Sequence, residues 1–488
     1  MSDKTSRDYG YDLIVIGGGT AGMAVARQVG RAGKRVALIE ANKTGGECLY
    51  TGCVPSKSLI ASARVVAMVR RADEFGVSTS APTVDMARVV RRTNAIIRAA
   101  GEPDTPEAIA KDGVEVIAGT ARFVDPHTVA VDDRRLRAEQ LVIATGSQPA
   151  VPPVDGLSKA GFLTHEGILE LCEVPRRLAV IGAGPVGLEL GQAFLRFGSA
   201  VTVVDHRGRV LSGDDVDNAA DVRKALEAEG MTFHLGSRVS QVKGTPDGKR
   251  LTVERGDGRM TEVEVDEILV ATGRTPNVDS LNLGAAGVTL TPTGVRVDGS
   301  LRTSVEHIWA CGDVTGPPYY THAADAQGRT VATGVLGGKA NWDGRAVPWV
   351  TFTEPEIAGV GLTEERARER YGRKLEVLTL PYGRVDRALT DGQEAGRIKV
   401  LLAPGWLRGR VGGEVVGAHV VGANAGEVVQ QFAFMMAWRL PAGMLAKTVQ
   451  SYPTYSLGGR QAVGIHWHRK PGSTSTPSFV SRLLAKVT

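Results

Sequence analysis

The chain of 488 residues has few cysteines, few aromatic residues and no long apolar stretch. Four cysteines are too few for a disulfide scaffold in a chain of this length, so a closely spaced pair indicates redox or metal chemistry. No apolar run approaches the roughly 20 residues that cross a bilayer, and the N-terminus lacks an apolar stretch of signal-peptide type. We therefore expect a cytoplasmic protein without a membrane partner.

The charge of the chain does not indicate a nucleic-acid partner, although it is positive overall. The net charge is +5, but the basic residues are scattered, are mostly arginines, and form no stripe. The shares of hydrophobic residues, 42%, and charged residues, 23%, are typical of a globular protein. A length of roughly 150 residues per domain predicts about three domains.

Two segments, residues 11–42 and 176–207, have the same layout. Each has an apolar strand, a glycine-rich turn, an amphipathic helix, and a second apolar strand that ends in an acidic residue. Such duplicated βαβ units predict an α/β protein with two doubly wound, Rossmann-like dinucleotide-binding domains. Residues 54–72 predict a helix with Pro55 in its first turn. From about Pro348 the pattern becomes α+β, which predicts a third domain.

The first glycine-rich turn has the motif G-x-G-x-x-G at Gly17, Gly19 and Gly22. The first glycine permits a tight turn, the second a close approach of a pyrophosphate, and the third close packing of helix on strand. The N-terminus of the following helix offers unpaired N–H groups and the positive end of a dipole to the phosphates. Glu40 ends the next strand, where a carboxylate binds ribose hydroxyls. The whole unit predicts dinucleotide binding.

The second glycine-rich turn repeats the motif at Gly182, Gly184 and Gly187, with Asp205 in the acidic position. A carboxylate there repels the 2′-phosphate of NADP and so favours NAD. Arg207 follows two residues later, however, and arginine is the residue that usually accepts a 2′-phosphate. We expect NADH or NADPH as the electron donor, with NAD slightly preferred.

Cys48 and Cys53 lie in the segment GGECLYTGCVPSK. With four residues between them, they can close a small disulfide ring if the intervening chain coils. Cys53 lies just before the Pro55 helix, and the positive end of a helix dipole lowers the pKa of a thiol. No second cysteine or histidine pair lies nearby at ligand spacing, so this pair favours electron transfer or thiol–disulfide exchange over a metal site. Cys172 and Cys311 have no partner at a useful spacing and are expected to be buried.

Several motifs together resemble the FAD-dependent pyridine nucleotide–disulfide oxidoreductases, which include dihydrolipoamide dehydrogenase, glutathione reductase and mercuric reductase. They are both glycine motifs, GGxCxxxGCxPSK, ATG at 144–146 and TGRTPN at 272–277. The segments IWACGDVTG at 308–316, TFTEPEIAGVG at 351–361 and GANAGEVVQ at 422–430 extend the resemblance. It implies a homodimeric enzyme that uses FAD and NAD(P)H and has a C-terminal dimerisation domain.

The resemblance predicts where the domains begin and end. The expected parts are an FAD-binding domain in two pieces, 1–150 and 275–345, an NAD(P)-binding domain, 151–274, a dimerisation domain, 346–462, and a flexible tail, 463–488. The tail is basic and rich in proline, serine and threonine, so it is expected to be loosely held. Its segment FVSRLLAKV is either a short amphipathic helix or a frayed terminus, and its histidines, His466 and His468, are expected to be solvated.

Carried over to this sequence, the resemblance assigns roles to the redox residues. Cys53 would face the flavin as the charge-transfer thiolate, and Cys48 would be the interchange thiol that meets the acceptor. Lys57 and Glu189 would form an ion pair beside the flavin N5, where the hydride arrives. Asp313 would contact the ribityl chain of the flavin. The other residues expected at the cofactors are Thr145, Gly146, Gly273 and Ala323.

One segment departs from the family pattern His-Pro-Thr-x-x-Glu, which supplies an acid–base histidine and its orienting glutamate across the dimer interface. The corresponding stretch is QSYPTYSLGG, with Tyr452 in place of the histidine and Leu457 in place of the glutamate. A free tyrosine has a pKa near 10, so only about 0.1% of it is ionised at pH 7. Tyr452 is therefore a candidate hydrogen-bond donor but a poor general base, which weakens the case for lipoamide or glutathione turnover.

The small-molecule electron acceptor therefore stays open between a disulfide, a thiol-bound metal ion such as Hg(II), and a quinone. Mercuric reductases resemble the chain in having a tyrosine near position 452, and soft thiolates bind soft metals. They usually also carry a vicinal pair of C-terminal cysteines, which this sequence lacks. The segment VDHRGRVL at 204–211 suggests a transhydrogenase, although the cysteine pair argues against it. An FAD-binding redox sensor without turnover is the non-enzymatic alternative.

Overall fold

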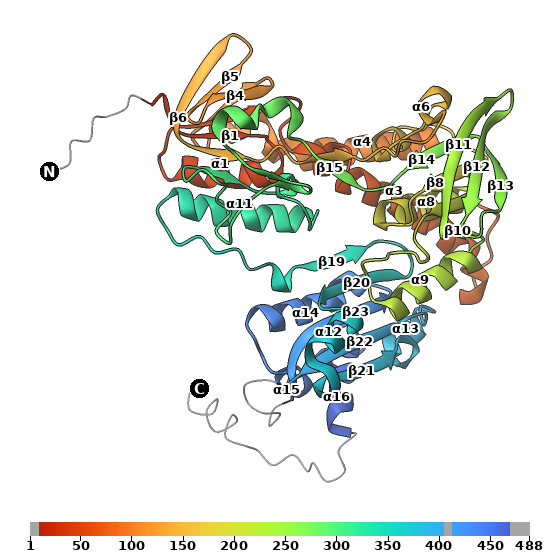
Figure 1. Cartoon of the computed structure of the whole chain (residues 1–488). Coiled ribbons are helices and arrows are strands. Elements are labelled where there is room, and N and C mark those ends of the chain that lie inside the picture. The colour runs from red at the N-terminus through yellow and green to blue at the C-terminus, as the bar shows by residue number, and fades with distance from the viewer. Residues whose placement is uncertain (1–8, 405–411, 469–488) are drawn as a thin grey trace, which may run out of the picture. The chain divides into compact units, whose positions relative to one another are not determined.

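Apolar, β-branched runs form the centre of the first sheet in the computed structural model, which describes residues 9–404 and 412–468 (Figure 1). Five strands run parallel in the order β3-β2-β1-β6-β18: β1 (Tyr11–Ile16), β2 (Val36–Glu40), β3 (Val114–Ala118), β6 (Arg134–Ile143) and β18 (Ile308–Ala310). The antiparallel strands β4 (Ala121–Asp125) and β5 (Thr128–Val131) extend the sheet beyond β6. Leu13, Ile14 and Val15 are fully buried, as expected for a parallel sheet covered on both faces.

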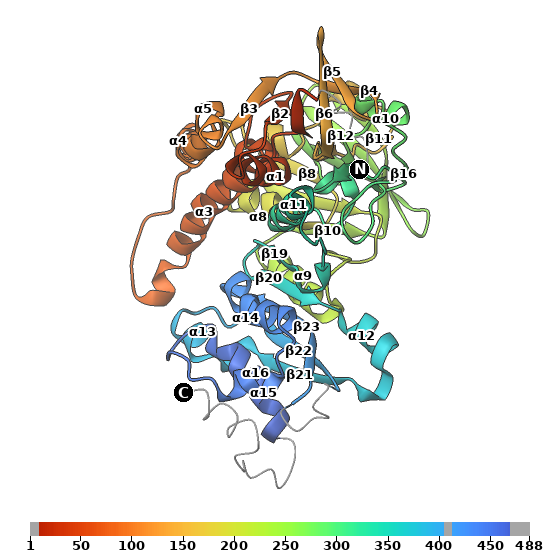
Figure 2. The same cartoon turned by 90° about the vertical axis from the view of Figure 1, so that its left-hand side faces the viewer.

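Two helices lie side by side on this sheet, α1 (Thr20–Arg31) and α11 (Thr321–Val335), as Figures 1 and 2 show. Glycine permits their close approach, because a Cβ atom at Gly328 would lie 2.5 Å from the carbonyl oxygen of Ala21. The other helices of this region are α2 (Gly46–Tyr50), α3 (Cys53–Arg70), α4 (Met86–Gly101) and α5 (Pro106–Ala110). The helix predicted for residues 54–72 is confirmed as α3.

The second glycine motif belongs to a second parallel sheet. Its strands follow the order β10-β9-β8-β14: β8 (Arg177–Ile181), β9 (Ala200–Asp205), β10 (Thr232–Leu235) and β14 (Glu267–Val270). Helix α8 (Pro185–Phe197) connects β8 to β9. The two predicted Rossmann-like domains are therefore confirmed.

Smaller elements complete this part of the chain. An antiparallel sheet consists of β11 (Ser237–Thr245), β12 (Gly248–Arg255) and β13 (Met260–Val265), and two ribbons pair β7 (Ser147–Pro149) with β15 (Arg274–Pro276) and β16 (Leu290–Thr291) with β17 (Gly294–Val295). The short helices are α6 (Leu157–Ala160), α7 (His165–Ile168) and α10 (Leu283–Ala286). The β7–β15 ribbon joins residues that flank the two predicted dinucleotide sites.

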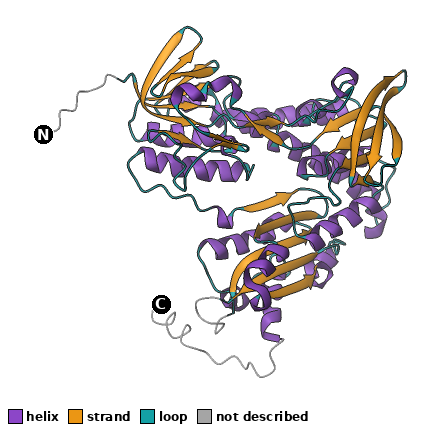
Figure 3. Ribbon diagram, viewed as in Figure 1, coloured by secondary structure: helices purple, strands orange, loops and turns teal. Residues whose placement is uncertain are grey.

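The C-terminal domain is α+β, as predicted, and is built on one antiparallel sheet (Figure 3). Its strand order is β19-β20-β23-β22-β21: β19 (Pro348–Thr351), β20 (Glu356–Gly361), β21 (Glu376–Pro381), β22 (Arg397–Ala403) and β23 (Glu414–Gly422). Its helices are α12 (Glu364–Tyr371), α13 (Asp386–Thr390), α14 (Ala425–Ala437), α15 (Ala442–Lys447) and α16 (Leu457–His468). Helix α14 packs on β20 and β23 around the fully buried Phe432.

The chain folds into two units whose boundary differs from the sequence division. The first contains residues up to 212 together with 226–344, and the second contains 213–225 together with the residues from 345. Helix α9 (Val216–Ala228) thus lies mostly in the second unit, although the sequence division placed it within 151–274. The physical reason is a set of ion pairs. Asp215 accepts a hydrogen bond from Lys399 at 2.7 Å, and Asp221 pairs with Arg397 at 2.6 Å.

The boundary of the predicted C-terminal tail also differs. Helix α16 continues to His468, and Val463 and His466 are buried. The Nδ1 atom of His466 lies 2.6 Å from Oε2 of Glu376, so the prediction that this histidine is solvated is wrong. Residues 463–468 are therefore part of the folded domain, because one face of α16 packs on β21 and β22. The segment FVSRLLAKV lies outside the described residues.

One stretch has the length and composition of a membrane-spanning helix. Residues 46–70, which include α2 and α3, meet both criteria. These criteria alone are weak evidence, because helices packed inside proteins also meet them. Here α3 packs against α4 and α8.

The Lys399 cluster yields a stability prediction. The Lys399 side chain is 3% exposed, and its ammonium lies 2.6–2.8 Å from carboxylate oxygens of Asp215, Asp217 and Glu364. These bonds raise the pKa of Lys399 despite its burial, which by itself lowers it. Replacing Lys399 with Met leaves Asp215 buried without its ammonium partner. We expect the free energy of unfolding of the second unit to fall by about 3–5 kcal/mol, measured by chemical denaturation.

The matched control is Lys374→Met, which removes an exposed lysine of the same unit. It should change the free energy of unfolding by less than about 0.5 kcal/mol. Equal effects of the two substitutions would contradict a stabilising role of the cluster.

Candidate active site

The first glycine-rich turn has the shape of a phosphate-binding loop. Gly17 has a φ of +105°, and a Cβ atom there would lie 2.3 Å from the carbonyl oxygen of Ala144. A Cβ atom at Gly22 would lie 1.9 Å from the carbonyl oxygen of Gly17, so helix and strand pack at the limit of contact. Gly19 has open space around it and precedes α1, whose N-terminus has no side-chain cap. The unpaired N–H groups of α1 therefore fit the pyrophosphate of FAD.

Glu40 and the loop after β6 complete this cradle. The Glu40 carboxylate accepts hydrogen bonds from the N–H groups of Gly18, at 2.6 Å, and Asn42, at 2.7 Å. Thr145 donates its hydroxyl hydrogen to the carbonyl of Asn277 at 2.7 Å, and the Asn277 side chain donates to the carbonyl of Thr145 at 2.9 Å. Gly146 follows with a φ of +70°. The predicted residues of the FAD site thus lie around one glycine loop.

The second glycine-rich turn repeats this geometry. A Cβ atom at Gly182 would lie 2.3 Å from the carbonyl oxygen of Ala271, and one at Gly187 would lie 2.1 Å from that of Gly182. Gly184 and Gly273 face open space, and the N-terminus of α8 has no side-chain cap. This arrangement fits the pyrophosphate of a second dinucleotide.

The acidic end of β9 bears on the choice between NAD and NADP. Asp205 accepts hydrogen bonds from the N–H groups of Ala183 and Arg207, both at 2.7 Å. The guanidinium of Arg207 donates to the hydroxyl of Ser212 at 2.5 Å. His206 is exposed, and its Nδ1 lies 3.4 Å from Asp205. The carboxylate is therefore held at the end of β9 beside the glycine loop, and the neighbouring arginine side chain bonds to Ser212.

The two cysteines meet at the N-terminus of α3. Cys48 lies in α2, Cys53 is the first residue of α3, and both are free thiols in this structure. The hydroxyl of Thr321 donates to Sγ of Cys48 at 3.1 Å and lies 3.5 Å from Sγ of Cys53. Thr321 is the first residue of α11, so the helix that packs on α1 also places a hydroxyl between the two sulfur atoms.

The surroundings of the two thiols favour a single thiolate on Cys53. The hydrogen bond from Cys48 lowers the pKa of Cys53 to about 6, with further help from Thr321 and the charge of Lys57. The pKa of Cys48 is raised by its hydrogen bond to Cys53 and by burial. The position of Cys53 at the positive end of α3 acts in the same direction. At neutral pH the reduced pair therefore carries its negative charge on Cys53.

Lys57 and Glu189 form the predicted ion pair. Nζ of Lys57 lies 2.7 Å from Oε2 of Glu189, which is buried in α8. Lys57 lies four residues after Cys53 on α3, so both side chains project from the same face of the helix. The pair connects the cysteine helix to the helix of the second glycine motif.

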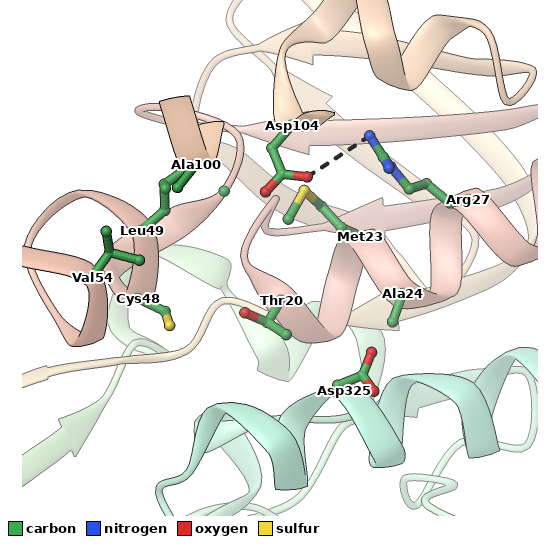
Figure 4. A pocket seen from close by; sticks show the side chains of 11 residues that line it. Thr20, Met23, Ala24, Arg27, Cys48, Leu49, Val54, Ala100, Asp104 and Asp325 are labelled. Carbon is green, nitrogen blue, oxygen red and sulfur yellow. Dashed lines mark ion pairs between the residues drawn. The ribbon is translucent and has the colours of Figure 1, made fainter. Parts of the chain in front are cut away.

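A cavity of about 340 Å³ opens beside Cys48 (Figure 4). Its walls come from α1, α2, α3, α11 and the end of α4. The lining residues are Thr20, Met23, Ala24, Arg27, Gly45, Cys48, Leu49, Val54, Ala100, Asp104 and Asp325. Most of the lining is small or apolar. Arg27 donates to the carbonyl of Pro103 and lies 3.8 Å from Asp104, so its charge is already close to a carboxylate.

A polar network that the sequence analysis did not predict lies around Asp313. The Asp313 carboxylate accepts a hydrogen bond from the hydroxyl of Ser147 at 2.6 Å, and its pKa is raised mainly by burial. Ser147 in turn accepts from Arg274 at 2.6 Å, and Arg274 also binds Glu47. Nε2 of His165 lies 2.7 Å from Glu47. Asp313 is thus linked through Ser147, the residue after Gly146, to the Arg274–Glu47 pair.

Ala323, one of the residues expected at the cofactors, is buried in α11.

Of the two remaining cysteines, Cys311 is buried as predicted, and burial raises its pKa to about 12. Cys172 is exposed, so the prediction that it is buried is wrong. It lies in the link between α7 and β8, where its thiol approaches the carbonyl oxygen of Glu170 at 3.6 Å. Within residues 9–404 and 412–468, no group of three or more His, Cys, Asp and Glu side chains is placed to hold a metal ion.

Tyr452 belongs to the second unit, whereas Cys48 and Cys53 belong to the first. Its side chain is 70% exposed, and its hydroxyl bonds to the carboxylate of Asp386, which raises the pKa of Tyr452. Leu457, at the position of the family's glutamate, is buried. The same two segments also meet where Tyr455 donates to Asp391 at 2.7 Å. Tyr452 therefore has a carboxylate partner, but one from α13 that the sequence pattern did not indicate.

Comparisons with known proteins agree with this geometry. The family described as pyridine nucleotide-disulphide oxidoreductase matches residues 11–328, and its dimerisation domain matches residues 347–462. A mercuric reductase from Bacillus cereus is 36% identical over 460 residues, which cover 93% of this chain and 71% of that protein. A dihydrolipoyl dehydrogenase from Bacillus subtilis is 32% identical over 450 residues, covering 91% and 96%.

Among solved structures, the fold is similar to the HOCl-induced flavoprotein disulfide reductase RclA from Escherichia coli. The TM-score is 0.82 at 29% sequence identity, and the match covers 93% of this chain and 100% of that one. The comparisons therefore extend over both predicted nucleotide-binding domains and the C-terminal domain.

The position of Thr321 yields a prediction about the thiolate. Thr321→Val keeps the shape of the side chain and removes the hydroxyl that bonds to Cys48 and approaches Cys53. We expect the pKa of Cys53 to rise from about 6 by about one pH unit, the order of one hydrogen bond to a charged group. The measurement is the pH dependence of the charge-transfer absorption of the two-electron-reduced holoenzyme, which is lost as pH falls through this pKa.

The control for this prediction is Thr333→Val in the same helix, because the Thr333 hydroxyl donates to the carbonyl of Arg329 within α11 at 2.9 Å. Its titration should match the parent. A Thr321→Val titration that also matches the parent would contradict the role of the hydroxyl.

Proposed function

Because the chain belongs to the pyridine nucleotide-disulphide oxidoreductases, we propose that it passes electrons from NAD(P)H through FAD to the Cys48–Cys53 disulfide and on to a small acceptor bound beside Cys48. The observation that carries this proposal is the meeting of the two thiols on Thr321, with Cys53 at the N-terminus of α3 and Cys48 at the cavity. FAD, when bound, accepts a hydride from the nicotinamide and supplies two electrons to the disulfide.

After that transfer, Cys48, Cys53 and Lys57 have separate roles. Two electrons cleave the sulfur–sulfur bond, and one proton goes to Cys48 while Cys53 keeps its negative charge. A disulfide acceptor is reduced when deprotonated Cys48 attacks one of its sulfur atoms and releases the other as a thiolate. Cys53 then attacks Cys48, restores the internal disulfide and releases the second acceptor thiolate. Lys57 holds positive charge beside Cys53 throughout, because Glu189 fixes its ammonium.

We further propose a homodimer in which the second unit supplies Tyr452 to the partner's dithiol. The match to the family's dimerisation domain supports this, as do exposed apolar side chains of the second unit. Phe434, Trp438 and Val449 are 60%, 70% and 94% exposed. A tyrosine whose pKa is raised does not remove a proton from a thiol at pH 7, so in the dimer Tyr452 gives up its bond to Asp386 and acts as a hydrogen-bond donor to an anion instead.

The acceptor that the cavity supports best is small and without net negative charge. Arg27 shares its charge with Asp104 and Pro103, and a second carboxylate, Asp325, lines the wall. Such a wall offers an anionic disulfide no cation other than an arginine that already lies close to two carboxylates, Asp104 and Asp112. A thiol-bound soft metal ion is the second candidate, favoured by the dithiol together with Tyr452 and by the similarity to mercuric reductases.

The first test compares cysteine variants against several acceptors. Cys53→Ser should abolish the charge-transfer absorption, whereas Cys48→Ser should keep it and lose turnover of lipoamide or Hg(II) by at least about 10³-fold. Cys172→Ser, an exposed cysteine outside the site, is the control and should match the parent. Tyr452→His, run in parallel, should raise lipoamide turnover because imidazole titrates near 6.5.

The outcomes distinguish the alternatives. Turnover of a quinone that survives in Cys48→Ser means that the acceptor takes electrons directly from the flavin. Transfer of hydride between NADPH and NAD⁺ in both cysteine variants means a transhydrogenase. Reduction of the flavin without turnover of any acceptor means a redox sensor. A charge-transfer absorption that persists in Cys53→Ser rules out the dithiol proposal itself.

We propose NADH as the preferred donor, because Asp205 places a carboxylate at the ribose while the Arg207 side chain bonds to Ser212. Asp205→Asn keeps the shape and removes the charge, so the KM for NADPH should fall by about fivefold, the order of a repulsion of about 1 kcal/mol. Steady-state kinetics with each nucleotide provide the measurement. Asp257→Asn, an exposed carboxylate in the same part of the chain, is the control. A parent that prefers NADPH would contradict the proposal.

A cytoplasmic location remains a prediction.

A further inference from the structure

Glu47, the residue directly before Cys48, holds the turn between the two cysteines closed through its backbone. Its carbonyl oxygen accepts hydrogen bonds from the N–H groups of Thr51, at 2.9 Å, and Gly52, at 2.6 Å. These bonds fold the chain back so that Cys53 begins α3 next to Cys48. The distance between the two sulfur atoms therefore depends on where Glu47 is held.

The side chain of Glu47 is clamped from two directions. Nη1 of Arg274 donates to Oε1 at 2.8 Å, and Nη2 of the same arginine donates to Oε2, so the guanidinium binds both carboxylate oxygens. Nε2 of His165 lies 2.7 Å from Oε1. Arg274 is in β15 and His165 is in α7, and each is largely buried. Two elements distant in sequence thus hold one carboxylate of the cysteine turn.

Arg274, which binds Glu47, is itself held in place by Ser147. Nε of Arg274 donates to the hydroxyl of Ser147 at 2.6 Å, and Nη2 donates to the Ser147 carbonyl at 2.9 Å. Asp313 lies farther from the guanidinium, with 3.5 Å between its Oδ2 and Nε. The guanidinium therefore binds Glu47 more closely than Asp313. Burial raises the pKa of Glu47, but the bonds from His165 and Arg274 outweigh it and hold the pKa below its usual value.

From these contacts we infer that Glu47 is a positioning residue of the redox pair: Arg274 clamps it while His165 lies against it, and its backbone holds Cys48 and Cys53 close enough to share the hydroxyl of Thr321. This inference rests on the proposed function, because it assumes that the pair cycles between dithiol and disulfide. It goes beyond the family motif GGxCxxxGCxPSK, in which the position of Glu47 is open. A turn that is already closed favours the disulfide, since less chain freedom is lost when the bond forms.

The test replaces Glu47 with Gln, which keeps the length of the side chain and removes the charge that Arg274 binds. Glu74→Gln is the matched control, because Glu74 also pairs with an arginine, Arg71 at 2.7 Å, but on the exposed end of the 3-10 helix after α3. The first readout is the equilibrium between disulfide and dithiol in dithiothreitol redox buffers, trapped by alkylation. We expect Glu47→Gln to destabilise the disulfide about tenfold, or about 30 mV, and Glu74→Gln to leave it unchanged.

The second readout is the charge-transfer absorption of the reduced holoenzyme as a function of pH. A looser turn weakens the hydrogen bond from Cys48 to Cys53, which is the largest cause of the low pKa of Cys53. The midpoint should therefore rise in Glu47→Gln by about one pH unit, the order of a bond to a charged group. The KM for the nicotinamide should not change, because Glu47 does not belong to the second glycine motif.

The outcomes separate this inference from the proposed function. A parent without charge-transfer absorption and without acceptor turnover means that the proposed function fails. A parent with both, together with a Glu47→Gln variant that matches it in disulfide equilibrium and pH midpoint, overturns only the role of Glu47. The redox-buffer measurement needs no bound FAD, so it remains decisive if Glu47→Gln binds the cofactor poorly.

Discussion

The close contact between the cysteine turn and the first glycine loop fixes the geometry on which the rest of the site depends. A Cβ atom at Gly46 would lie 2.8 Å from Cα of Gly19, and the N–H of Gly45 donates to the carbonyl of Gly18 at 2.9 Å. Gly19 opens the uncapped helix α1, so the loop that fits the FAD pyrophosphate touches the turn that carries the thiols. The distance from the phosphates to the redox pair is therefore built into the backbone.

Around this fixed backbone, hydrogen bonds and charges make the two chemically similar thiols unequal. Cys53 has the positive end of α3, the bond from Cys48, the hydroxyl of Thr321 and the ammonium of Lys57, all of which favour its thiolate. Cys48 is more buried and donates its proton towards Cys53, which favours its thiol. The asymmetry suits a pair in which one sulfur faces the electron donor and the other faces the acceptor.

More of the structure supports the proposed entry of electrons than supports their exit. The proposed entry uses two glycine loops, the Lys57–Glu189 ion pair and the thiolate of Cys53, all within the first unit. Exit needs a proton donor or acceptor near Cys48, and the family's histidine is replaced by Tyr452, which bonds to Asp386 in the second unit. A tyrosine beside a carboxylate is a donor of hydrogen bonds rather than a base. The dithiol of this chain therefore favours acceptors whose reduction does not depend on a general base.

The sequence by itself determined the two Rossmann-like domains, the glycine loops and the cysteine pair, because these depend on local periodicity and on motif spacing. The Lys57–Glu189 pair, whose members lie 132 positions apart, was expected only from the resemblance to the family. The sequence did not predict Thr321, Arg274 or His165 at the site, since none lies near the cysteines in sequence. It also expected Cys172 to be buried, whereas this cysteine is exposed. Those features depend on which distant side chains meet, and only tertiary packing brings together residues more than 100 positions apart, such as Glu47 and Arg274.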